Sequence, residues 1–311
     1  MIMPCPVCGS EQYKELFQDC NRRDALEYEG AYVECKFCSL VYLLNRASWE
    51  EIVRFYSTLD PEVTTNSGKT DIDELKQQID KPVSKLRKLL RQFRFRPHSY
   101  PLESVPYKSK RILDLGCGNG SKLAEFAKRG YEIWGVDVSK NAIEVSQNIL
   151  PEGHFLTSEL SNINLTSNYF DYIRIDNALE HTPRPREVIK ECYRLLKTGG
   201  QLLIYVPHGK SMSMRIMKGD SISSWIPFHL QLFTPGSLGR LMSGANFKNI
   251  QIYNFSPNNW LALSIMQRYN RKKAKQLSPP AWLVWTTYLL SWLAGKFRMG
   301  EELIGTGQKT G

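Results

Sequence analysis

A glycine-rich stretch, "ILDLGCGNG" from Ile112 to Gly120, constrains the fold of this chain more than any other feature. An apolar run leads into it and "SKLAEFAKRG", a helical pattern, follows it, so it lies at a strand–loop–helix junction. Gly116, Gly118 and Gly120 allow the backbone to turn sharply and to approach a ligand closely. The spacing alone is not specific, because dinucleotide-binding folds use related loops.

Two acidic residues narrow the interpretation of this loop. Asp114 lies in the strand just before the first glycine, and Asp137 ends the next expected strand, "EIWGVD". An acid at the end of that second strand can accept two hydrogen bonds from a ribose diol. The pattern therefore favours a ligand that contains a ribose.

Strand and helix patterns alternate from residue 107 onward. The expected strands are "RILDLG", "EIWGVD", "HFLTSE", "FDYIRID" and "QLLIYVP". The expected helices include "SKNAIEVSQNIL", capped by Ser139, and "REVIKECYRLLKTGG", stopped by two glycines. This alternation predicts an α/β fold with a parallel sheet that is covered by helices on both faces.

Four motifs resemble those of class I S-adenosylmethionine-dependent methyltransferases. "ILDLGCGNG" resembles their motif I, and "VDVS" resembles their ribose-binding acid. "FDYIRIDNALEH" resembles their fourth strand and the loop after it, and "RLLKTGGQLLIYVP" resembles the helix and turn before strand five. The resemblance implies a Rossmann-like seven-stranded sheet, with residues 247–255 as strand six and residues 301–309 as an inserted antiparallel strand seven.

The resemblance also implies how S-adenosylmethionine binds. The glycine loop would face the methionine portion, with Asp114 ordering the loop and holding the amino group. Asp137 would bind the ribose, Val138 would pack on the adenine, and "TSEL" would flank the adenine. The implied cofactor-binding residues are Asp114, Gly116, Cys117, Gly118, Asp137, Val138, Ser158, Glu159 and Asn177.

Catalysis needs a positioned nucleophile, the exclusion of water and, for a hydroxyl acceptor, a general base. His181, after the fourth strand, is the first candidate for that base, and His208 and His229 are alternatives. Asp176 lies at the carboxyl end of the fourth strand, where open α/β sheets place their sites. Residues 208–233 form a long connection that we expect to be an acceptor-binding lid rather than a loose surface insertion. Proximity without any base is the remaining alternative.

Two Cys-x-x-Cys pairs, Cys5 with Cys8 and Cys35 with Cys38, indicate a metal site. Together they supply the four thiolates that Zn²⁺ binds tetrahedrally, and such a closed site is structural rather than catalytic. Residues 1–45 are therefore expected to be a small zinc-ribbon-like segment that the metal helps to fold. The alternative is a zinc-free redox pair.

A helical connector, residues 46–106, is expected between this segment and the methyltransferase domain, residues 107–311. Ser48 and Glu51 form a capping-box pattern at its start. The net charge of +10 is concentrated in Lys81–Arg96, with seven basic residues, and in Arg268–Lys275, with five. Such basic segments favour phosphate-bearing partners, or they are solvated helix faces.

The acceptor is predicted less directly. The cysteine pairs, "SWEEIVRFY" and "FHLQLFTPGSLGRLMSGANF" resemble a bacterial methyltransferase subgroup associated with polysaccharide and cell-envelope pathways, although Phe228 stands where a basic residue is common. We therefore expect methyl transfer to a hydroxyl or similar nucleophile of a glycan, cell-envelope or small-metabolite acceptor. The alternatives are an RNA methyltransferase, in which the zinc segment and the basic helix bind nucleic acid, and a binding module without catalysis.

The apolar stretch "PAWLVWTTYLLSWLAGKF", Pro280–Phe297, lies in a helical insertion expected over residues 256–299. Its fifteen uncharged residues would span only ~22 Å as a helix, and a membrane crossing between two neighbouring strands would prevent the sheet from closing. Either it pairs with "NNWLALSIMQRYN" as a hairpin that roofs the acceptor site, or residues 258–297 lie at a membrane interface with Trp282, Trp285 and Trp292 at headgroup level. Since the first residues carry no secretory signal, we expect a cytoplasmic protein, with any such contact at the inner face of the membrane.

Overall fold

The computed structural model describes residues 3–20, 28–48, 50–52, 110–161, 163–256, 260–269 and 279–311. Most of the predicted connector, including the basic helix over residues 81–96, lies outside the described residues, and so does the basic run at residues 271–275. The start of the connector is described, and there Glu51 N donates to Ser48 Oγ at 3.2 Å while Ser48 N donates to Glu51 Oε2 at 2.7 Å. The predicted capping box is confirmed.

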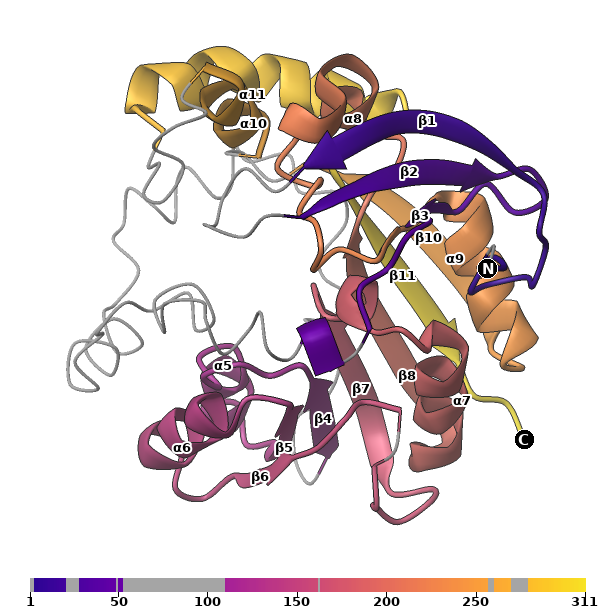
Figure 1. The fold of residues 1–311 in the computed structure, drawn as a ribbon. Coiled ribbons are helices and arrows are strands. Elements are labelled where there is room, and N and C mark those ends of the chain that lie inside the picture. Colours follow the sequence, from indigo (N-terminus) through magenta and orange to yellow (C-terminus); the bar gives the residue numbers. More distant parts are fainter. Residues whose placement is uncertain are drawn as a thin grey trace.

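The chain alternates strands and helices in the expected order (Figure 1). The strands are β1 (Tyr13–Cys20), β2 (Glu29–Cys35), β3 (Val41–Leu43), β4 (Arg111–Leu115), β5 (Glu132–Asp137), β6 (His154–Thr157), β7 (Phe170–Asp176), β8 (Leu196–Pro207), β9 (Gln231–Leu232), β10 (Lys248–Phe255) and β11 (Glu302–Gln308). The α-helices are α5 (Leu123–Ala127), α6 (Lys140–Ile149), α7 (Pro185–Leu195), α8 (Met212–Met217), α9 (Pro235–Gly244), α10 (Trp260–Tyr269) and α11 (Ala281–Lys296). Two short 3₁₀ helices are η2 (Leu179–His181) and η3 (Lys218–Asp220).

Seven strands form one sheet in the order β10-β11-β8-β7-β4-β5-β6. Strands β4, β5, β6, β7 and β8 run parallel to one another, and β11 is inserted antiparallel between β8 and β10. The predicted seven-stranded Rossmann-like sheet with an inverted last strand is therefore confirmed. The carboxyl ends of β4, β5 and β7 meet at one edge, where open α/β sheets bind their ligands.

Helices cover both faces of this sheet (Figure 1). Neighbouring residues in β4 point to opposite faces, so Leu113 packs with α7 and α9, whereas Ile112 packs with α5 and α6. Ser139 caps α6 as predicted, since its side chain accepts from Ala142 N. This double coverage explains why the parallel strands are nearly continuous apolar runs.

The expectation that two glycines stop the helix before β8 is wrong. That helix, α7, ends at Leu195, and Leu196 already pairs with Phe170 of β7. Gly199, with φ of +83°, lies inside β8 where the pairing register between β7 and β8 shifts. The glycine therefore permits a bend within a strand rather than the end of a helix.

A second, antiparallel sheet joins the amino terminus to the methyltransferase fold. Its strand order is β1-β2-β3-β9, and β9 comes from the 208–233 segment. Leu43 N donates to Leu230 O at 2.9 Å, and the Tyr32 hydroxyl donates to His229 O at 2.8 Å. The amino-terminal segment thus shares a sheet with the 208–233 segment, and the domain boundary at residue 45 stays a prediction.

The C-terminal helices α10 and α11 pack against each other (Figure 1). Helix α10 also contacts α8 and η3, and Ser264 Oγ in α10 accepts from Ile222 N at 3.0 Å. In the described ranges, no helix combines the length and the apolar character needed to span a bilayer.

Candidate active site

The glycine loop follows β4 and is tied to the end of β5. Gly116 N and Cys117 N both donate to Val136 O, at 2.7 and 3.1 Å. Gly116, Gly118 and Gly120 all have positive φ, at +77°, +53° and +73°. Residues other than glycine rarely adopt a positive φ, so the loop needs glycine at each of these three positions.

The three glycines differ in the space around them. A Cβ on Gly116 would lie 2.4 Å from the Cβ of Ala178, and one on Gly120 would lie 2.9 Å from Ser146 Oγ. A Cβ on Gly118 would meet no described atom within 4 Å. The protein's own packing therefore requires two of the glycines, whereas Gly118 borders open space that a ligand can fill.

Asp137 links the loop to the second strand of the sheet's ligand-binding edge. Its Oδ2 accepts from Gly118 N and its Oδ1 from Ser139 N, both at 2.9 Å. Burial raises the pKa of Asp137. Each carboxylate oxygen has a second lone pair, so both oxygens can still accept from a ribose diol.

Apolar and polar groups expected around the adenine lie next to Asp137. Val138 is 42% exposed, which is unusual for valine and leaves an apolar face for a ring to cover. Ser158 N donates to Asp137 O at 3.0 Å, and Glu159 follows it with an exposed side chain. These positions are compatible with the predicted cofactor contacts, which stay predictions.

Asp114 is held by a buried arginine that the sequence analysis did not select. Arg174 of β7 pairs in register with Asp114 of β4, and its Nη1 donates to Asp114 Oδ2 at 2.8 Å. Asp114 Oδ1 is buried and has no hydrogen-bond partner among the described residues. Burial raises the pKa of Asp114 to about 6. The free oxygen fits a donor supplied by a ligand, such as an ammonium group.

The polar network continues to the last strand. Arg174 Nη2 also contacts Asp176 Oδ2, and Asn177 Nδ2 donates to Asp176 Oδ1 at 2.8 Å and to Glu302 Oε1 at 3.1 Å. Asn177 has φ of +50°, a left-handed conformation that recurs at functional sites. Burial, reinforced by the nearby charge of Asp176, raises the pKa of Glu302 to about 8.

The raised pKa of Glu302 predicts that the stability of the folded protein depends on pH, and that Glu302→Gln removes this dependence. Since folding raises the pKa of Glu302 from 4.5 to about 8, the folded state binds more protons than the unfolded state between those values. Wild-type stability should therefore fall as pH rises through that window, by up to about 1.4 kcal/mol per pH unit, relative to the variant. Urea denaturation at several pH values, with exposed Glu152→Gln as control, measures the difference. Parallel curves for Glu302→Gln and wild type would contradict the prediction.

His181 and His229 lie together beyond the end of β7, and the structure separates His208 from them. The rings of His181 and His229 are 4.7 Å apart between centroids. Burial lowers the pKa of His181 to about 4. His208 is buried at the junction of β8 and β11, with its Nδ1 2.9 Å from Gly300 O. Of the three histidines, two therefore lie together beyond the end of β7, in contact with Trp225.

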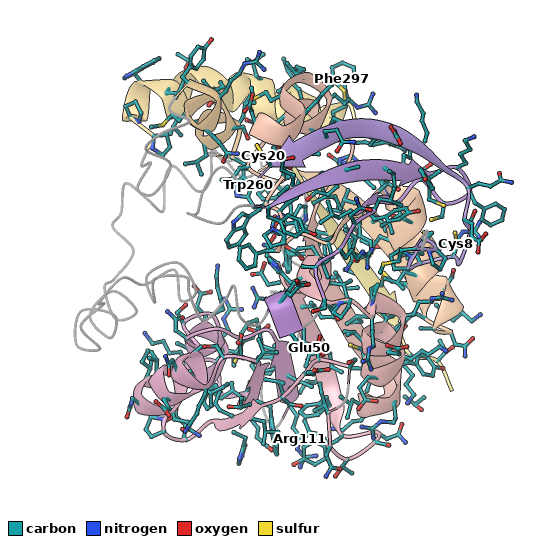
Figure 2. All side chains as sticks on the ribbon, in the orientation of Figure 1. Cys8, Cys20, Glu50, Arg111, Trp260 and Phe297 are labelled. Atoms are coloured by element: carbon teal, nitrogen blue, oxygen red, sulfur yellow. The ribbon has the colours of Figure 1, made fainter. Side chains whose placement is uncertain are left out.

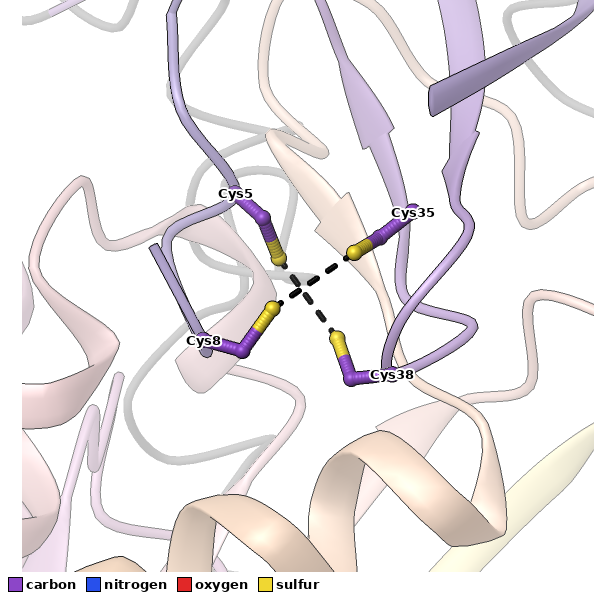
Figure 3. A group of neighbouring side chains, drawn as sticks. All are labelled: Cys5, Cys8, Cys35 and Cys38. Carbon is purple, nitrogen blue, oxygen red and sulfur yellow. Dashed lines mark hydrogen bonds between the residues drawn. The ribbon is translucent and has the colours of Figure 1, made fainter. Parts of the chain in front are cut away.

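The four predicted zinc ligands form one cluster (Figure 3). The Cys5–Cys38 and Cys8–Cys35 sulfur pairs are both 3.5 Å apart, and all four sulfurs lie within 4.8 Å of one another. These separations are far longer than the ~2.05 Å of a disulfide. They are close to the ~3.8 Å edge of a tetrahedron with ~2.3 Å Zn–S bonds. The cluster fits zinc and not a pair of disulfides.

Arg174, Glu180 and Glu302 are not among the predicted site residues. Arg174 has a usable signal, because a charged residue inside the apolar "FDYIRID" strand requires a buried partner. Glu180 lies in "FDYIRIDNALEH", which resembles a methyltransferase motif but does not by itself give the residue a role. Glu302 follows a long insertion, and nothing near it in the sequence shows that it reaches the end of β7.

The sheet order and the loop at the end of β4 define the Rossmann-like fold of class I S-adenosylmethionine-dependent methyltransferases. A family model described as "Methyltransferase domain" matches residues 79–252, more than half of the 311 residues. The chain belongs to this family. Among solved structures, phosphoethanolamine N-methyltransferase 2 of Haemonchus contortus, in complex with S-adenosyl-L-methionine, has a TM-score of 0.50 at 17% identity. The match covers 96% of this chain and 69% of that one, and bears on the fold alone.

Curated relatives match part of the chain. It is 27% identical over 154 residues to a ubiquinone biosynthesis O-methyltransferase of Idiomarina loihiensis, covering 46% of this chain and 63% of the relative. It is 33% identical over 107 residues to a protein of the same name in Coxiella burnetii, covering 33% of this chain and 46% of the relative. The chain thus spans less than two thirds of the length of these relatives.

Proposed function

We propose that this protein transfers a methyl group from S-adenosylmethionine to a hydroxyl or similar nucleophile of a small-metabolite, glycan or cell-envelope acceptor. The observation that carries the proposal is the open space at Gly118, bordered by the Asp137 carboxylate and the exposed Val138. The O-methyltransferase names of the curated relatives favour an oxygen acceptor.

Specific side chains would bind the cofactor. The free Oδ1 of Asp114 suits the methionine ammonium, and Asp137 suits the ribose hydroxyls. Val138 offers a face for the adenine, with Ser158 and Glu159 near its edge. When bound, S-adenosylmethionine supplies a methyl group on a sulfonium, so the leaving group needs no protonation.

The acceptor would bind beside His181 and His229. The start of η2 lies against the glycine loop, since the Ala178 Cβ fills the space next to Gly116. Burial lowers the pKa of His181 to about 4, so its imidazole is neutral at physiological pH and would position the acceptor hydroxyl rather than take its proton. Asp176 would act through the Arg174 and Asn177 network at the same edge, as a positioning residue.

Two measurements test the proposal. Isothermal titration with S-adenosylmethionine should show binding, and labelled methyl groups should enter hydroxyl-bearing metabolite or envelope fractions. Absence of cofactor binding would overturn the enzyme proposal. Label that enters only RNA would replace the acceptor class with nucleic acid, the alternative that the basic segments favour.

We further propose that α10 and α11 make peripheral contact with a membrane surface. Trp282 and Phe297 are 66% and 70% exposed, and Figure 2 shows Phe297 at the outer side of the molecule. Aromatic side chains beside basic residues such as Lys296 and Arg298 are typical of interfacial helices. In the alternative arrangement, α10 and α11 form a hairpin that roofs the acceptor site.

Replacing both Trp282 and Phe297 with serine should weaken co-sedimentation with anionic vesicles several-fold, because each ring removes apolar area from the interface. Phe37→Ser is the control, since Phe37 is 66% exposed but lies in the cysteine segment. Equal vesicle binding by wild type and the double variant would exclude membrane contact through these residues.

A further inference from the structure

Glu180 is a buried carboxylate beyond the end of β7, and no described lysine or arginine forms an ion pair with it. Its side chain is 0% exposed, and neither carboxylate oxygen has a hydrogen-bond partner in the part of the chain that the structure describes. Burial raises its pKa, and the charges that act on it most are the acids Asp176 and Glu302. A buried carboxylate in such surroundings requires a cation or a proton.

Two imidazoles next to Glu180, those of His181 and His229, have the tautomer that metal binding requires. His181 Nδ1 lies 3.0 Å from Phe228 O, and His229 Nδ1 lies 2.7 Å from Ser223 O. A carbonyl oxygen can only accept, so each Nδ1 carries the proton and each Nε2 carries the lone pair. Metal-bound histidines show this arrangement, because a carbonyl that binds the second nitrogen orients the ring and fixes the tautomer.

The three side chains converge on one point. One ligand atom from each of Glu180, His181 and His229 lies within 4.8 Å of the others, and His181 Nε2 is 3.9 Å from Glu180 Oε1. Two atoms that bind one ion at about 2.1 Å are at most about 4.2 Å apart. The separations are therefore close to those that a shared ion requires.

We propose that Glu180, His181 and His229 bind one divalent transition-metal ion. Two imidazoles and one carboxylate suit zinc, iron(II), cobalt(II) or manganese(II) better than magnesium or calcium, which prefer oxygen ligands. Three protein ligands leave coordination positions open, unlike the closed cysteine cluster.

The ion would connect two elements of the site. Glu180 and His181 belong to η2, whereas His229 belongs to the 208–233 segment, so metal binding would hold that segment against the end of β7. If the proposed methyl transfer is correct, an acceptor hydroxyl would occupy an open position, and its pKa would fall through contact with the cation. The metal site itself does not depend on that reaction.

The test measures how many cobalt(II) or zinc(II) ions each chain binds. Wild type should bind two ions per chain, one at the thiolates, which give cobalt an intense sulfur-to-metal absorption, and one without that band. Glu180→Gln removes an unpaired buried charge at nearly unchanged volume, so it should fold and bind only the thiolate ion. His229→Ala should do the same.

Glu302→Gln is the matched control, because Glu302 is a buried acid of the same edge but outside the cluster of three. It should retain both ions. A wild-type chain that binds only the thiolate ion, or Glu180→Gln and His229→Ala chains that both retain two, would overturn the proposal. Failure of S-adenosylmethionine binding, measured separately, would instead contradict the proposed methyl transfer.

Discussion

Gly118→Ala is expected to weaken S-adenosylmethionine binding by about tenfold or more, equivalent to about 1.4 kcal/mol or more. No described atom lies within 4 Å of the added Cβ, so the methyl group would enter only the space proposed for the cofactor. Gly118 N also donates to Asp137 Oδ2, the carboxylate proposed for the ribose. A small shift of this loop therefore disturbs two sets of contacts at once.

Gly130→Ala is the matched control for this prediction. Gly130 follows α5, has φ of +82°, and likewise has no described atom within 4 Å of an added Cβ. Both variants thus carry a similar backbone penalty, about 1–2 kcal/mol. Isothermal titration should show a loss of affinity in Gly118→Ala alone, and denaturation should show similar losses of stability. If both variants bound the cofactor as wild type does, Gly118 would not border the binding site.

Cys35→Ser should sharply weaken zinc binding at the cysteine cluster and unfold much of the amino-terminal sheet. Structural zinc supplies about 10–16 kcal/mol of apparent binding free energy in small zinc-dependent peptides, and three thiolates bind it less tightly than four. Strand β2 ends at Cys35 and pairs with both β1 and β3, so loss of the metal releases one end of the sheet. Zinc analysis and hydrogen exchange of the β2 amides measure the two effects.

Cys20→Ser provides the control, because Cys20 ends β1 far from Cys8 and is not part of the cluster (Figure 2). It should retain zinc and slow exchange in β2. Zinc affinity equal to wild type in Cys35→Ser would contradict the four-thiolate site.

Cys35→Ser should also weaken binding of the proposed acceptor. Tyr32 of β2 and Leu43 of β3 hold the backbone at His229 and Leu230 through hydrogen bonds of 2.8 and 2.9 Å. When the sheet unfolds, the 208–233 segment loses this support while the glycine loop keeps its contacts with β5. Cofactor affinity should therefore change less than affinity for the acceptor.

Much of this molecule follows from signals within a few residues. The cap at Ser139 and the capping box at Ser48 and Glu51 were predicted because they depend only on neighbouring side chains and backbone groups. The glycine loop and the cysteine pairs are equally local. The alternation of strand and helix patterns also predicted the parallel sheet, since apolar runs indicate which strands are buried.

The tertiary structure decided which side chains meet. Asp114 and Arg174 are 60 residues apart, and Asn177 and Glu302 are 125 apart; each contact depends on strand order and register. Strand β9 has two residues, too few for any periodic pattern, yet it brings His229 to η2. Periodicity reports which face of a strand is buried, but not which strand lies beside it. The meeting of Glu180, His181 and His229 therefore depends on pairing between distant segments, which the sequence does not show.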